Sequence, residues 1–200
     1  AVYWRSGDDG IIQGSQFTSN VNTIGSRDAS WGAVVMHFQG TFANNQIHNG
    51  PHMGLYLSSN AGSQVYGNTI KLKTKYTNGF GIAAWGDGTE VYDNLIDCGH
   101  ADYSARGIFI RGSEGTRRVF DNTIRVQGFA NNQEYSGNGG VQLGGVYGIQ
   151  IENDSNAEIF GNAVFVNAEQ SMGYAFRANG DVDNVNVYEN TFEVQNNGSR

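Results

Sequence analysis

Short segments in which apolar and polar residues alternate recur along the whole chain. The clearest segment begins with Val or Ile, continues with an aromatic residue, and carries Asn at its fourth position. It occurs at residues 65–70, 91–96, 119–124, 159–164 and 187–192, with weaker copies at 12–17 and 42–47. Alternation with a period of two predicts β-strands with one buried face. Because Asn suits tight turns, each copy is predicted to contain a sharp corner between two strands.

A second recurring segment, a Gly followed by apolar residues, precedes the Asn positions from residue 45 onward by 13 to 17 residues. Its glycines are Gly32, Gly54, Gly81, Gly107, Gly148 and Gly173. A third short apolar segment follows several of the Asn positions, so that one repeat contains three strands. This arrangement predicts a coiled chain in which equivalent residues of successive coils stack about 4.8 Å apart.

Stacked coils predict columns of similar side chains. We expect one inward column to consist of Leu55, Ile82, Ile108, Ile149 and Tyr174, and another of Val65, Val91, Val119, Ile159 and Val187. An outward column of rings is expected at Tyr66, Tyr92, Phe120, Phe160 and Tyr188. These rings could form a platform for sugar rings or for another protein, or a stack that stabilises neighbouring strands. The sequence leaves both interpretations open.

Together the repeats resemble the right-handed parallel β-helix superfamily, which includes pectate-lyase-like proteins and PbH1 repeats. The resemblance covers nearly all of the 200 residues. It implies an all-β fold, a right-handed single-stranded parallel β-helix of about seven coils with three short parallel sheets and an Asn ladder at one corner. We expect the ladder to join Asn68, Asn94, Asn122 and Asn162 through hydrogen bonds, with left-handed or bridging φ angles.

Residues 1–200 are expected to form a single β-helix domain, either a segment of a longer protein or an uncapped protomer. The reason is that no amphipathic helix that could cover the outermost strands is evident at either end. The first coil, around residues 11–17, and the last, around 187–194, should therefore expose unpaired strand edges. Such edges favour end-to-end self-association into a filament.

Composition narrows the classes of fold and partner. The chain has 29 Gly, a single Pro and 16% charged residues, which argues against a helix bundle. A net charge of −7 argues against a nucleic-acid partner. No apolar run approaches the roughly 20 residues of a membrane span, so membrane insertion is not expected. The single cysteine, Cys98, excludes an intrachain disulfide and leaves the cellular compartment open.

Reactive side chains gather in the segments between the third strand and the next Gly, which should follow one another along one edge of the rod. Four of them are expected to converge as catalytic residues: His52, Lys75, His100 and Arg106. A cation can stabilise the carboxylate and enolate of a uronic acid, and these side chains can move its protons. Four more are expected to bind the substrate: Tyr76, Tyr103, Tyr135 and Arg111. The resemblance implies only the location of the site, beside the Gly strands, because no lyase or epimerase motif of the superfamily occurs here.

Other charged residues carry weaker predictions. A row of alternating charge is expected at Arg111, Glu152 and Arg177. Carboxylates at Asp8 with Asp9, and at Asp87 near Glu90, offer oxygen ligands for Ca²⁺, although their spacing matches no known calcium loop. We therefore expect no cofactor, with calcium as the ion that the sequence leaves open.

The sequence thus predicts an extracellular or cell-surface β-helix protein that acts on or binds an acidic polysaccharide, as a lyase, an epimerase or a non-catalytic binding module. Three lysines at positions 71, 73 and 75 favour an acidic glycan. The alternative is a non-enzymatic assembly module, such as a fibre, tailspike or surface-layer segment, that stacks through its open ends. Whether the chain is an enzyme stays open at this point.

Overall fold

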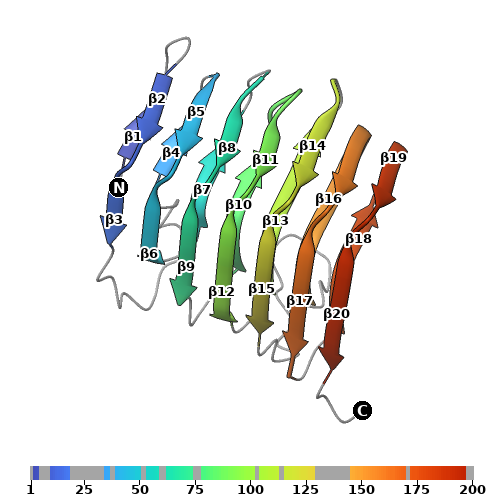
Figure 1. The fold of residues 1–200 in the computed structure, drawn as a ribbon. Coiled ribbons are helices and arrows are strands. Elements are labelled where there is room, and N and C mark those ends of the chain that lie inside the picture. Colours follow the sequence, from blue (N-terminus) through green and yellow to red (C-terminus); the bar gives the residue numbers. More distant parts are fainter. Residues whose placement is uncertain are drawn as a thin grey trace, which may run out of the picture.

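The computed structural model describes residues 2–4, 10–18, 34–36, 39–50, 53–58, 62–73, 78–101, 104–112, 115–128, 145–169 and 172–196. Every regular element in these ranges is a β-strand, and every strand pairing is parallel (Figure 1). No helix within the same ranges is long and apolar enough to cross a membrane. The all-β prediction is therefore confirmed.

The strands form three parallel sheets, and the chain visits the sheets in a fixed order. The first sheet contains β1 (Val2–Trp4), β4 (Val34–Met36), β7 (Met53–Leu57), β10 (Asn78–Ala84), β13 (Ser104–Gly112), β16 (Gly145–Phe160) and β18 (Met172–Asn179). The second contains β2 (Gly10–Gln13), β5 (Gly40–Ala43), β8 (Gln64–Tyr66), β11 (Glu90–Tyr92), β14 (Arg117–Phe120), the second part of β16, and β19 (Asp183–Tyr188). The third contains β3 (Gln16–Thr18), β6 (Gln46–Gly50), β9 (Thr69–Lys73), β12 (Leu95–Ala101), β15 (Thr123–Gly128), β17 (Ala163–Ala168) and β20 (Thr191–Asn196).

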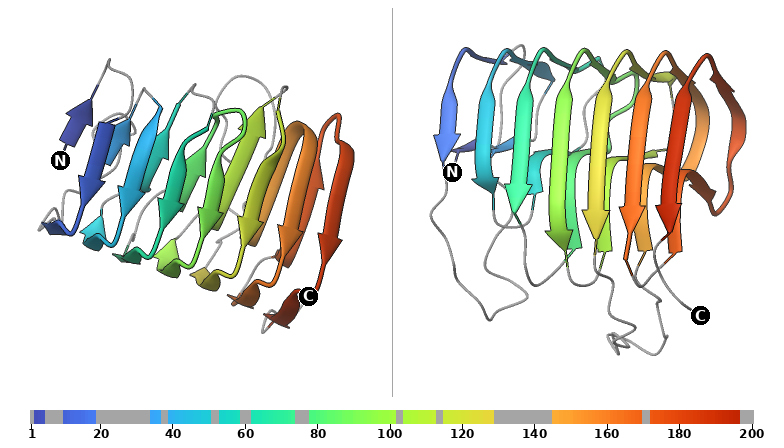
Figure 2. Two further views of the ribbon diagram at one scale, coloured as in Figure 1. Left: turned by 45° about the horizontal axis from the view of Figure 1, so that its top comes forward. Right: turned by 60° about the horizontal axis from the view of Figure 1, so that its bottom comes forward.

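We call one strand from each sheet in succession, such as β10, β11 and β12, a coil. Each strand pairs with its counterparts in the neighbouring coils, so the coils stack into a rod with β1–β3 at one end and β18–β20 at the other (Figures 1 and 2). Strands that are adjacent in a sheet are therefore separated by a whole coil in the sequence, as the repeats predicted.

The core lies between the sheets and is built from the predicted inward columns. Leu55, Ile82, Ile108 and Ile149 occupy consecutive register positions and are fully buried. The prediction is wrong for the last member, because Phe176, not Tyr174, pairs with Ile149. We call the glycine that directly precedes each buried residue of this column, such as Gly148 before Ile149, the column glycine. In the last coil Ala175 takes this position, so Gly173 lies two residues before it. Tyr174 lies instead beside Tyr147, outside the core.

The glycines before the apolar segments mark a bend at which the first sheet approaches the third. A Cβ atom at Gly81 would lie 2.5 Å from both the carbonyl oxygen of Gly107 and Cγ2 of Ile96, and a Cβ at Gly107 would lie 2.6 Å from the carbonyl oxygen of Gly148. Position 81 therefore faces the core, as does the next residue, Ile82. Two consecutive inward positions break the alternation at this point.

A ladder of asparagines closes the corner between the second and third sheets, as predicted. Each ladder Asn accepts hydrogen bonds through Oδ1 from the preceding one: Asn94 Nδ2 donates to Asn122 Oδ1 (3.0 Å) and Asn122 Nδ2 to Asn162 Oδ1 (2.9 Å). The ladder also includes Asn45 and ends at Asn190. The buried amides thereby satisfy one another from coil to coil.

The predicted left-handed backbone lies one residue earlier than expected. Asp93, Asp121 and Asn44 have φ angles of 52°, 54° and 55°, whereas none of the ladder asparagines has a positive φ. The residue directly before each ladder asparagine is therefore mostly Gly, Asn or Asp, the types that tolerate a left-handed backbone. The ladder Asn itself is selected for its amide group and not for its backbone.

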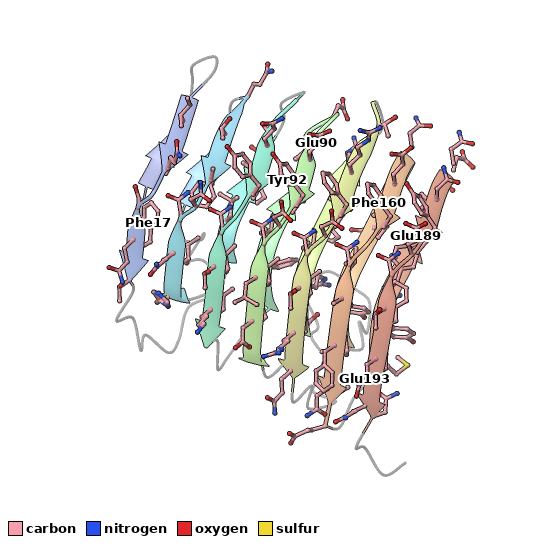
Figure 3. The ribbon with its side chains drawn as sticks, viewed as in Figure 1. Phe17, Glu90, Tyr92, Phe160, Glu189 and Glu193 are labelled. Atoms are coloured by element: carbon pink, nitrogen blue, oxygen red, sulfur yellow. The ribbon has the colours of Figure 1, made fainter. Side chains whose placement is uncertain are left out.

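The predicted outward column of rings is a continuous stack along the second sheet. Tyr66, Tyr92, Phe120, Phe160 and Tyr188 follow one another with centroids 4.8 to 5.1 Å apart and interplanar angles of 2° to 12°. Figure 3 shows Tyr92 and Phe160 on the same outer face. Each ring between the two ends of the stack has another ring on both of its faces, so only its edge is open to a ligand. This geometry favours the stabilising role over a sugar platform.

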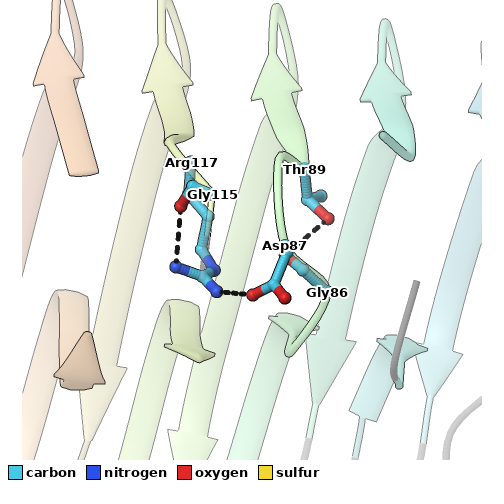
Figure 4. A network of polar contacts seen from close by, with 5 residues as sticks. All are labelled: Gly86, Asp87, Thr89, Gly115 and Arg117. Carbon is cyan, nitrogen blue, oxygen red and sulfur yellow. Dashed lines mark hydrogen bonds and ion pairs between the residues drawn. The ribbon is translucent and has the colours of Figure 1, made fainter. Parts of the chain in front are cut away.

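An ion pair between a buried arginine and a partly exposed aspartate links two successive coils at the corner between the first and second sheets (Figure 4). The guanidinium of Arg117, whose side chain is 0% exposed, contacts Asp87 in the preceding coil and also donates to the carbonyl oxygen of Gly115 (3.3 Å). The hydroxyl of Thr89 donates to the carbonyl oxygen of Gly86 and fixes the turn that carries Asp87. Asp87, considered above as a calcium ligand, thus serves as the partner of an arginine.

Candidate functional site

Aromatic and arginine side chains gather on the outer face of the first sheet, the face that points away from the core. We call this surface the arginine–aromatic face and define it by Phe80, Trp85, Arg106, Arg111, Tyr147 and Arg177. Phe80, Arg106 and Tyr147 are register neighbours on β10, β13 and β16. The bend at the column glycines turns these side chains outward while the next two positions face the core. The face is therefore positioned by strands.

Arg106 lies at the centre of this face, packed between rings. Its guanidinium carbon is 4.7 Å from the ring centroid of Phe80, 5.3 Å from that of Tyr147 and 5.7 Å from that of Phe109. Its Nε donates a hydrogen bond to Oε1 of the buried Gln150 (2.5 Å). Contacts of a guanidinium with ring faces and an amide hold the group in one orientation.

Arg177 approaches Tyr147 from the next coil. One of its terminal nitrogens donates to the Tyr147 hydroxyl oxygen (2.6 Å), and its guanidinium carbon lies 5.1 Å from the Tyr147 ring centroid. Tyr147 stacks on Tyr174, with centroids 5.6 Å apart and planes inclined by 8°. Tyr147 thus contacts two guanidinium groups, those of Arg106 and Arg177, and brings two positive charges to one ring.

Arg111 and Trp85 form the more exposed part of the face. The guanidinium carbon of Arg111 lies 5.6 Å from a Trp85 ring, and Trp85 packs edge-on against Tyr56, 5.1 Å away. Trp85 is 37% exposed, whereas Tyr56 is buried. Burial raises the pKa of the Tyr56 hydroxyl, although its hydrogen bond with Ser58 and the charge of Arg111 act in the opposite direction. Tyr56 therefore remains a neutral hydroxyl at physiological pH.

The face carries positive charge in a chain whose net charge is −7. Arg111 and Arg177 form no ion pair with any carboxylate in the described ranges, although Glu152 is the register neighbour of Arg111. By contrast, Arg118 on the second sheet lies between Glu90 (3.7 Å) and Glu158 (3.0 Å). The expected charge row of Arg111, Glu152 and Arg177 is wrong for its third member, because Arg177 pairs with Gln150 and Asn179 follows Glu152.

The structure places three of the eight residues predicted to form the site. Arg106 and Arg111 both lie on β13 and belong to the arginine–aromatic face, and Arg106 is a strand residue instead of the predicted loop residue. His100 lies in β12, near the end of that strand. The remaining five lie outside the described residues: His52, Lys75, Tyr76, Tyr103 and Tyr135. Their convergence with Arg106 therefore stays a prediction.

Sequence reasoning missed the aromatic partners on this face. Phe80, Trp85 and Tyr147 belong to Gly-containing strands or directly follow one, and they occupy outward positions there. A signal was present, because aromatic and basic residues recur directly before the column glycine and four places after it. The broken alternation at the bend hid which face they occupy.

The single cysteine, Cys98, lies in the core of the rod and not on its surface. Its side chain belongs to the core between Leu72 and Val126 on β12, and it is 3% exposed. Burial raises the thiol pKa far above its ordinary value of 9.0, with a smaller contribution from Asp97. The thiol is therefore protonated and unreactive in the folded chain. Within the described part of the chain, no cluster of three or more His, Cys, Asp or Glu side chains could hold a metal ion.

No protein-family model, no curated protein sequence and no solved structure matches the chain.

Proposed function

We propose that the chain binds an acidic polysaccharide along the outer face of the first sheet. The observation that carries this proposal is the arginine–aromatic face, on which Arg111 and Arg177 carry guanidinium groups beside aromatic rings. A guanidinium can bind a carboxylate through two parallel hydrogen bonds, and an exposed ring such as Trp85 can pack against the apolar face of a sugar. Because the face crosses several coils, a bound glycan would run along the rod.

We further infer that the fold is the right-handed single-stranded β-helix of the pectate-lyase-like class, with about seven coils. The three parallel sheets and the Asn ladder support this inference, and right-handed crossovers are the rule for parallel strands. Residues 1–200 would then act as one domain at the cell surface or outside the cell. A lyase or epimerase activity adds His52, Lys75 and His100 to Arg106 as the groups that move protons.

Binding to acidic glycans is tested by calorimetry with polygalacturonate, alginate and hyaluronan at two salt concentrations. We expect binding to at least one of them that weakens as salt rises, and an Arg111→Gln variant with about tenfold lower affinity. Arg118→Gln is the matched control, because it removes the same charge from a different sheet and should leave the affinity unchanged. Equal losses in both variants, or no binding to any of the three glycans, would refute the proposal.

Catalysis is tested separately by the absorbance of unsaturated uronate products and by the ratio of epimers in each glycan after incubation. A lyase or an epimerase would lose this activity in Arg106→Gln while the fold is retained. Binding without any product would assign the chain to non-catalytic glycan recognition.

The alternative function, an assembly module, is supported by the exposed apolar side chains of the last described coil. Val187, Phe192 and Val194 are 39%, 41% and 40% exposed, although equivalent residues in the other coils belong to the core. A further coil, from the same chain or from a second molecule, would bury them.

A further inference from the structure

A hollow of about 490 Å³ lies on the outer face of the third sheet. The side chains that face it come from three neighbouring strands, β15, β17 and β20. They form two rows in register, Thr123, Ala163 and Thr191 in one row and Arg125, Phe165 and Glu193 in the other. The first and third sheets pack against each other through the core, so this hollow faces away from the arginine–aromatic face. We call it the third-sheet groove.

Phe165 differs from the other outward rings of the rod. The five rings of the second sheet stack on one another, whereas Phe165 has no ring or cation partner in the described part of the chain. Its register neighbours are Arg125 on one side and Glu193 on the other, and it remains partly exposed. The small side chain of Ala163 beside it leaves room, so at least part of the ring is open to a ligand.

The polar side chains around Phe165 have unused hydrogen-bonding capacity. Arg125 forms neither a hydrogen bond nor an ion pair with any described residue, and Thr123 and Thr191 are exposed residues. Glu193, labelled in Figure 3, accepts one hydrogen bond from Gln195 Nε2 (3.2 Å) and keeps further acceptor sites. The groove therefore offers five donors from one guanidinium, acceptors from one carboxylate, and two hydroxyls that serve as either.

We propose that the third-sheet groove binds a neutral oligosaccharide that lies along the rod axis. A sugar ring has an apolar C–H face that packs on an aromatic ring, and hydroxyls at its rim that both donate and accept hydrogen bonds. The groove provides partners for both. One cation and one anion give its lining no net charge, which distinguishes it from the arginine–aromatic face and favours an uncharged ligand. The groove crosses three stacked strands, so its length follows the rod.

The proposal is tested with ¹⁵N-labelled chain and four neutral probes: cellohexaose, xylohexaose, mannohexaose and maltohexaose at millimolar concentration. We expect at least one probe to shift the backbone amide resonances of Thr123, Phe165 and Thr191 in a saturable manner. Phe165→Ala should lower the affinity about tenfold. Leu95→Ala is the matched control, because Leu95 is an exposed apolar residue in the coil before Thr123 and does not line the groove.

Two further variants separate this proposal from the others. Glu193→Gln keeps a hydrogen-bonding side chain and should retain most of the affinity for a neutral sugar; a loss as large as that of Phe165→Ala would overturn the neutral-ligand assignment. Arg111→Gln should leave the affinity of the groove for the neutral probe unchanged, because Arg111 lies on another sheet. The result for the groove is therefore independent of whether the arginine–aromatic face binds an acidic glycan. Shifts confined to the first sheet, or no shifts with any probe, would also overturn the proposal.

Discussion

At the residue scale, the ladder asparagines show why one side-chain type recurs at the corner. Nδ2 of Asn122 donates to the carbonyl oxygens of Val91 (2.8 Å) and Phe120 (2.9 Å), while its Oδ1 accepts from the backbone nitrogen of Asn94 (3.1 Å). A carboxylate would supply only acceptors, and an apolar residue would leave several buried polar groups without partners. The amide provides two N–H donors and an acceptor oxygen on one short side chain.

The Arg117–Asp87 pair leads to a prediction about unequal partners. Arg117 is 0% exposed, whereas the side chain of Asp87 is 36% exposed. Asp87→Asn removes the carboxylate from a guanidinium that cannot return to water, so we expect a loss of about 3 kcal/mol in unfolding free energy. Arg117→Met fills the same space and lets Asp87 be solvated, so its loss should be smaller. Urea denaturation of both variants measures the difference, and the reverse order would contradict this reading of burial.

At the element scale, the strands follow the sequence closely except at the bend. Alternation predicted the inward columns and the stacked rings correctly, because each outward or inward position repeats with its coil. It failed at Gly81 and its counterparts, where two consecutive positions face the core and a Cβ would meet a neighbouring carbonyl. The same interruption hid the fact that Arg106 belongs to a strand, whereas Tyr174 was misplaced because Ala175 takes the glycine position in its coil. Alternation of apolar and polar residues in the sequence does not reveal two consecutive inward positions, because these depend on how closely two sheets approach.

The stack of rings on the second sheet predicts that the effect of a substitution depends on the number of stacked neighbours. Phe120 has a ring on each face, and each stacked pair contributes about 0.5–1.5 kcal/mol, so Phe120→Ala should cost about 2 kcal/mol or more. Tyr188 has one such neighbour and is 44% exposed, so Tyr188→Ala should cost less. Thermal unfolding monitored by circular dichroism provides the comparison. Equal costs would show that the rings contribute only by covering the sheet.

At the scale of the whole molecule, repetition explains both what the sequence predicted and what it did not. The fold class follows from local repeats, because every coil meets the same neighbours. The candidate site does not, because its side chains come from the residues that differ between coils. Arg106, Trp85 and Arg177 each occur in one coil and meet only when the register is known. Arg117, too, occupies an inward position that nothing in the repeat reserves for an arginine.

The exposed apolar side chains of the last described coil predict self-association of the 200-residue chain. Val194 is 40% exposed at the end of an otherwise buried column. Contact between such surfaces removes apolar area from water, so sedimentation velocity should show oligomers whose share rises with concentration. Val194→Lys should shift the distribution toward monomer, while Thr191→Lys, which adds the same charge on the outer face of the same strand, should not. A monomer at all concentrations would contradict the prediction.

The direction of the backbone hydrogen bonds has a mechanical consequence. In all three sheets they join one coil to the next, so they lie along the length of the rod, and the Asn ladder lies in the same direction. A force applied to the two termini of the chain loads the bonds of the outermost coils first, because each terminus is attached to an outermost coil. The molecule should therefore yield by peeling, one coil at a time and at low force, while a force across the strands would have to shear many bonds together. The same rod should therefore resist force applied across its sides and unfold coil by coil under force applied at its ends.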